Sequence, residues 1–134
     1  MLIYQSCPWN IMEHEQVKLS DGSIVDKQII TLISRINALG FKTDMSCQNV
    51  NGFIWIRFPH PCQVNEFVQY LFATISRLSG ESIGSAKFFE WNVGTVHRIS
   101  GIGENAWKAT FSVIPGISLW IPISDRDLLE RLLE

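Results

Sequence analysis

Cys47 stands in the segment of the sequence with the strongest chemical character. It follows Ser46 and precedes Gln48 and Asn49, so a thiol lies beside a hydroxyl and two amides. A cysteine becomes a nucleophile when a neighbouring base lowers its pKa from the ordinary value of about 8.5. His60 is the base candidate, because it lies just past the strand expected to pair with the strand of Cys47. This pattern predicts a thiol-dependent enzyme in which Gln48 or Asn49 orients an oxyanion.

The same cysteine also has a purely structural interpretation. Free cysteine is among the residue types most often buried. Cys47 would then fill a small space in the core between Met45, Ile56 and Phe58. Because one cysteine and one histidine seldom make a site by themselves, we favour this interpretation over catalysis.

A zinc site is the next chemistry to consider. Cys47, His60 and Cys62 are suitable ligands, with His97 or His14 as a fourth. Structural zinc sites favour close ligand pairs such as Cys-x2-Cys, whereas only a rigid proline separates His60 from Cys62. We therefore expect no metal and no other cofactor.

Five tryptophans are many for a chain of 134 residues. Trp55 and Trp107 fit the inward positions of strands and are predicted to belong to the core. Trp9 and Trp120 are freer to contact a ligand or a second subunit, since aromatic anchors dominate interface energetics. The candidate binding residues are Ser46, Gln48, Asn49, Trp9 and Trp120.

Composition excludes several classes of function. The net charge is -2 and the basic residues are scattered, which disfavours nucleic acid as the main ligand. No apolar run reaches the length of about 18 residues that spans a membrane. The N-terminus does not read as a secretory signal, so we expect a cytoplasmic protein whose three cysteines are free thiols.

The elements that position these residues follow from turns and periodicity. Asp21-Gly22 predicts a hairpin in which Leu19 faces Ile24, and a helix over residues 26–39, capped by Asp26, follows it. A second helix over residues 63–79 carries an apolar stripe at helical spacing.

The second hairpin determines what faces Cys47. Asn51-Gly52 predicts a two-residue loop between strands 41–50 and 53–58. The predicted pairs are Val50 with Phe53, Gln48 with Trp55, Cys47 with Ile56 and Met45 with Phe58. Since residues 53–58 are apolar on both faces, this strand is expected inside the sheet.

The last third of the chain predicts a meander. Strands are expected near residues 86–91, 95–99, 107–114 and 117–121, with a turn at Pro115-Gly116 and a short helix capped by Ser124. The whole chain, residues 1–134, is expected to form a single α+β domain: a mostly antiparallel sheet with two main helices on one face and a short C-terminal helix. The open sheet edge favours a homodimer.

The first half of the chain carries a family resemblance. The segment from Gly40 to Gln48 has the pattern Gly-x-x-Thr-x-x-Ser-Cys-Gln, preceded by Leu32-Ile33 and Asn37 and followed by Trp55-Ile56. It resembles a group of uncharacterised bacterial conserved hypothetical proteins, and this resemblance implies no activity. Ser46-Cys47 is also similar to the start of the Ser-Cys-Ser-Gly-Arg signature of a tRNA wybutosine-synthesis methyltransferase family. Gln48 and Asn49 replace the rest of that motif, so no function is carried over.

No complete catalytic, metal or phosphate motif is present in the sequence. The Gly-x-Gly at residues 101–103, for example, lacks the third glycine and the following helix of a dinucleotide site. The sequence therefore favours a non-enzymatic domain that binds an unidentified small molecule or a protein partner. The alternative is the thiol-dependent enzyme with Cys47 as nucleophile and His60 as base.

Overall fold

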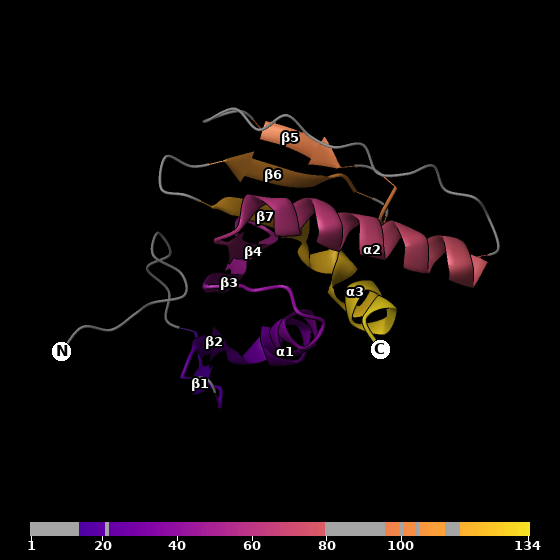
Figure 1. Ribbon diagram of the computed structural model, residues 1–134. Helices are drawn as coiled ribbons and strands as arrows, with labels where there is room; N and C mark the ends of the chain where they lie inside the picture. The colour runs from indigo at the N-terminus through magenta and orange to yellow at the C-terminus, as the bar shows by residue number, and fades with distance from the viewer. Residues whose placement is uncertain (1–13, 21, 80–95, 100, 104, 112–115) are drawn as a thin grey trace.

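The fold is α+β and its main sheet is antiparallel throughout (Figure 1). The computed structural model describes residues 14–20, 22–79, 96–99, 101–103, 105–111 and 116–134. The five strands lie in the order β3-β4-β7-β6-β5, and a separate pair, β1-β2, lies beyond β3. The strand bounds are β1 Gln16–Lys18, β2 Ile24–Asp26, β3 Met45–Val50, β4 Phe53–Phe58, β5 Val96–Ile99, β6 Trp107–Phe111 and β7 Ile117–Pro122.

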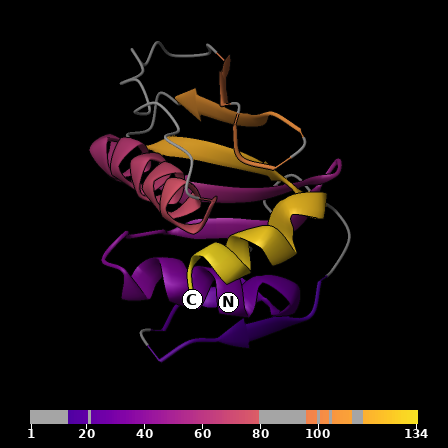
Figure 2. The same ribbon diagram turned by 90° about the vertical axis from the view of Figure 1, so that its right-hand side faces the viewer.

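Three α-helices lie on one side of the sheet (Figure 2). They are α1 Ile30–Ala38, α2 Pro61–Ser79 and α3 Arg126–Leu132, and short 3-10 turns, η1 Lys27–Ile29 and η2 Ile123–Asp125, lead into α1 and α3. The predicted arrangement of two main helices and a short C-terminal helix over one face is confirmed. The strand expected near residues 86–91 lies outside the described residues.

The core fills the space between the helices and one face of the sheet. Alternate residues of β4 and β7 point into it, among them Ile54, Ile56 and Leu119, and the stripe of α2 packs against them through Phe67 and Leu71. Each of these side chains is fully buried. β4 pairs with both β3 and β7, so its predicted interior place is confirmed, and its two apolar faces follow from that place.

Trp107 and Trp55 are both buried in the core as expected, but they belong to different clusters. Trp55 is buried on the opposite face of the sheet, in a second cluster with Cys47 and Val50. The alternation of β4 explains the difference, because Trp55 points away from its neighbours Ile54 and Ile56.

α1 ends as the sequence predicts. Gly40 adopts φ +95, its N–H bonds to the carbonyl of Asn37, and the N–H of Phe41 returns to the carbonyl of Ile36. Such a left-handed residue closes a helix, and glycine adopts it without strain. The predicted caps at the other ends are wrong: Asp26 makes no capping hydrogen bond, and Ser124 lies inside η2 while Asp125 occupies the N-cap position of α3.

The predicted hairpin registers are correct at some positions only. Val50 pairs with Phe53 as expected, but Cys47 pairs with Trp55 instead of Ile56, because β3 contains a bulge between Cys47 and Val50. The inserted residue shifts every pair beyond it by one place. In the first hairpin Ile24 pairs with Lys18, not Leu19, because the N–H of Leu19 bonds to the carbonyl of Ser23 across a longer loop.

β3 and β5 are the end strands of the sheet within the part of the chain that the structure describes. β3 is flanked by the β1-β2 pair (Figure 1). The homodimer expected through an open sheet edge stays a prediction.

Candidate functional site around Asp26, His14 and Cys47

Cys47 is fully buried and forms a disulfide bond. The expectation that all three cysteines are free thiols is therefore wrong for this residue, although it holds for Cys62, which is free and exposed on α2. The remaining cysteine of the sequence, Cys7, lies outside the described residues. The Cys47 sulfur is thus held in its oxidised state, which is not nucleophilic.

Asp26 lies at the end of β2 with no exposed surface. Its carboxylate accepts hydrogen bonds from the backbone N–H of Gln48 at 2.9 Å and from Nε2 of Gln16 at 3.1 Å. Nδ1 of His14 lies 3.0 Å from Oδ2, the same oxygen that accepts the Gln48 N–H. A buried carboxylate is costly unless several polar partners compensate it, and here residues 14–16 and Gln48 supply them. The residue expected to cap α1 is instead the centre of a polar cluster.

His14 joins this carboxylate to the cysteine. Its Nδ1 atom lies 3.9 Å from Sγ of Cys47 as well as 3.0 Å from Oδ2 of Asp26. The imidazole is largely buried, with 12% of the side chain exposed. Sequence reasoning considered His14 only as a fourth zinc ligand, because nothing local indicates that a residue before the first hairpin reaches the middle of β3.

His60 lies elsewhere. It is exposed in the connection between β4 and α2, five positions past Trp55, the partner of Cys47 across the hairpin. Strand rise alone puts Phe58 about 10 Å along β4 from Trp55, and His60 follows beyond it. The structure thus brings His14, and not His60, to the sulfur of Cys47.

The bulge in β3 determines which groups of the Ser-Cys-Gln segment contact Asp26. Because the pairing with β4 shifts here, the N–H of Gln48 is available to Asp26, and its side-chain Oε1 accepts the N–H of Gln28 at 3.3 Å. The side chain of Asn49 bonds within the hairpin loop instead, where its Oδ1 accepts the N–H of Gly52 at 3.0 Å. Ser46 is buried and pairs with Ile56. Of these candidate binding residues, only Gln48 reaches the site.

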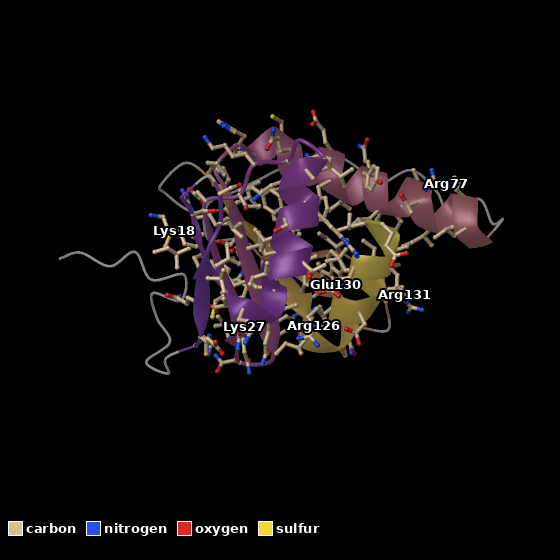
Figure 3. The ribbon with its side chains drawn as sticks, turned by 90° about the horizontal axis from the view of Figure 1, so that it is seen from below. Lys18, Lys27, Arg77, Arg126, Glu130 and Arg131 are labelled. Carbon is tan, nitrogen blue, oxygen red and sulfur yellow. The ribbon has the colours of Figure 1, made fainter. Side chains whose placement is uncertain are left out.

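A polar pocket of about 690 Å³ opens over this cluster, and we call it the His14 pocket. Its walls come from the segment before β1, from η1, from β3 and from α3. Figure 3 shows Lys27 of η1 and Arg126 and Glu130 of α3 gathered at this end of the molecule. The lining residues are His14, Glu15, Lys27, Gln28, Gln48, Arg126 and Glu130.

A smaller pocket of about 360 Å³ includes the predicted binding residue Trp120. Its groups contact one another: Nε1 of Trp120 donates to Oγ1 of Thr110 at 3.0 Å, and Nζ of Lys108 lies 4.1 Å from the centre of the Phe53 ring. Trp9, the other tryptophan proposed for binding, lies outside the described residues. This pocket has fewer charged lining residues than the His14 pocket, with Lys108 alone among them.

One group of metal-binding residue types occurs in the part of the chain that the structure describes. It is His14, Asp26 and Cys47, whose donor atoms all lie within 4.8 Å of one another. The zinc set weighed from the sequence, Cys47 with His60 and Cys62, does not form such a group there.

Comparisons with known proteins supply no relative: no protein-family model matches the chain, and neither a curated protein nor a solved structure matches it. Among the described residues, no helix has both the length and the apolar character needed to cross a membrane.

Proposed function

We propose that this protein is a non-enzymatic domain that binds a small hydrophilic molecule in the His14 pocket. The observation that carries the proposal is the convergence of charged and amide side chains from four separate segments on one concavity. Binding sites for small molecules are concave and present a few polar groups that converge on the ligand. The lining is polar, so the ligand is expected to be polar too.

The charges of the lining indicate which groups the ligand carries. The lining carries charges of both signs, since Lys27 and Arg126 are cationic and Glu15 and Glu130 are anionic. Gln28 and Gln48 provide amides beside them. Nζ of Lys27 is 3.4 Å from Glu15, but both side chains are more than half exposed, and such surface ion pairs contribute little and open readily. We expect the ligand to place an anionic group between Lys27 and Arg126 and to hydrogen-bond the amides.

A thermal-shift screen of small hydrophilic compounds, including carboxylates, phosphate esters and amino acids, tests this function. Lys27→Met and Arg126→Met should each weaken binding of a hit at least about fivefold, because each removes a charge-assisted contact. Lys18→Met and Arg131→Met are the matched controls, since these side chains do not line the pocket (Figure 3). A hit whose affinity changes equally in all four variants would refute binding at this pocket.

The thiol-dependent enzyme is the second candidate, and the 3.9 Å approach of His14 to Cys47 favours it. In a Cys-His-Asp relay the thiol and the carboxylate use opposite nitrogens of the imidazole. Here both contact Nδ1, and the sulfur is buried and oxidised. Turnover of a substrate panel by the reduced protein, lost in Cys47→Ala and His14→Ala but kept in His60→Ala, would establish the enzyme and replace the binding proposal.

We further propose that the protein works in the cytoplasm. Disulfides there are transient, so Cys47 would exchange between its disulfide and a thiol. His14 connects this sulfur to the pocket, because it lines the pocket and its Nδ1 atom lies 3.9 Å from Sγ of Cys47. Thiol trapping in intact cells, before lysis, tests whether a reduced fraction of Cys47 exists; complete oxidation would contradict a cytoplasmic site of action.

A further inference from the structure

Three different metal-binding groups meet beside the His14 pocket, and one of them, His14, lines it. Nδ1 of His14 is 3.0 Å from Oδ2 of Asp26 and 3.9 Å from Sγ of Cys47, and the three donor atoms lie within 4.8 Å of one another. In a tetrahedral zinc site, bonds of about 2.0–2.3 Å place the ligand atoms roughly 3.3–3.8 Å apart. Small side-chain adjustments would therefore bring all three donors to one ion.

The surroundings suit a bound cation. Asp26 is held by Gln16 and by the N–H of Gln48, and such bonds fix the direction of a ligand oxygen. Of the three donors, His14 is the one that lines the pocket, so we expect an ion to enter past its side chain. Histidine, carboxylate and thiolate together form a donor set typical of Zn²⁺ and similar divalent transition ions.

The disulfide prevents binding, because a metal needs the Cys47 thiolate. We propose that reduction of this disulfide turns His14, Asp26 and Cys47 into a site for a divalent transition-metal ion. The fourth position is left for water. Metal binding at these three residues does not require that the His14 pocket bind an organic ligand.

The chemistry balances with a dithiol reductant. The dithiol gives two electrons and two protons to the disulfide, which becomes two thiols, and the reductant is oxidised to its own disulfide. The metal then displaces the proton of the Cys47 thiol to the buffer. His14 binds through Nδ1 in its neutral form, with the ring proton on Nε2. Metal binding must therefore release protons and depend on pH.

Co²⁺ titration of the full chain provides the test, since coordination by thiolate gives a near-ultraviolet charge-transfer band. The reduced protein should show this band and the oxidised protein should not. His14→Ala and Cys47→Ala should each weaken Co²⁺ binding at least about tenfold, and Zn²⁺ should displace the Co²⁺. Reoxidation of the same sample should release the metal.

Control variants test whether the metal binds at His14, Asp26 and Cys47. Cys62→Ser and His60→Ala alter an exposed thiol and a histidine outside the cluster, and both should bind Co²⁺ like the wild type. A band of equal strength in the oxidised protein, or one lost in Cys62→Ser and kept in His14→Ala, would overturn the proposal. So would binding only by a reduced chain whose circular dichroism shows it to be unfolded. Ligand binding by the oxidised protein is a separate measurement, so either proposal can fail alone.

Discussion

The carboxylate of Asp26 accepts the backbone N–H of Gln48 at 2.9 Å, and this bond ties the end of β2 to the bulge of β3. One buried side chain thus joins the first hairpin to the main sheet and positions His14 and Gln48 beside each other. Because His14 and Gln48 both line the His14 pocket, this bond also fixes the position of the pocket.

Asp26→Ala should destabilise the protein strongly. It removes a fully buried carboxylate and leaves the donors of Gln48 and Gln16 without this acceptor, which costs about 3 kcal/mol in the free energy of unfolding. The control is Asp127→Ala, a carboxylate whose side chain is 83% exposed and which should change stability by less than about 0.5 kcal/mol. Urea unfolding measures both. Equal effects would contradict a structural role for Asp26.

Thiol accessibility should separate Cys62 from Cys47. In the native protein before reduction, iodoacetamide should modify the exposed Cys62 and leave Cys47 unmodified, because Cys47 is buried and disulfide-bonded. Peptide mass spectrometry should detect modified Cys47 only after treatment with a dithiol. In Cys62→Ser the rapid labelling should disappear. Rapid labelling of Cys47 in the unreduced protein would favour the thiol enzyme.

Two glycines with similar backbone angles should respond differently to alanine. Gly22 has φ +90 and open space where a Cβ would project, so Gly22→Ala should cost about 1 kcal/mol from backbone strain alone. Gly103 has φ +70, and its Cβ would collide with the carboxylate of Asp125, which accepts Nε1 of Trp107 at 3.0 Å. Gly103→Ala should cost about 2 kcal/mol more, through displacement of this buried pair. Thermal unfolding checks the difference, and equal losses would show that Asp125 moves aside freely.

Much of the fold can be predicted from the sequence because its signals are local. The stripe of α2, the closing glycine of α1 and the loop at Asn51-Gly52 each depend on residues a few positions apart, and all three are confirmed. The bulge in β3 has no such signal, since there the N–H of Gln48 bonds to Asp26 of another strand, 22 residues away. The register error followed from this long-range bond.

The site could be predicted only in part, for the same reason. Cys47 and Gln48 are recognisable as unusual neighbours, but their partners come from distant positions in the chain. Asp26 stands before a helix, where an aspartate normally caps, so its local context predicted a different role. The side chain of His14 reaches Cys47 across 33 residues, and no periodicity encodes that contact. The disulfide of Cys47 depends on tertiary proximity in the same way.

The most direct test of ligand binding is chemical-shift mapping on the oxidised, ¹⁵N-labelled full chain, with the strongest hydrophilic compound from the thermal-shift screen. The largest amide shifts should fall on His14, Lys27, Gln28 and Gln48, which come from three segments that meet at the His14 pocket. Shifts concentrated instead on Phe53, Lys108 and Trp120 would place the ligand in the smaller pocket and contradict the proposed site.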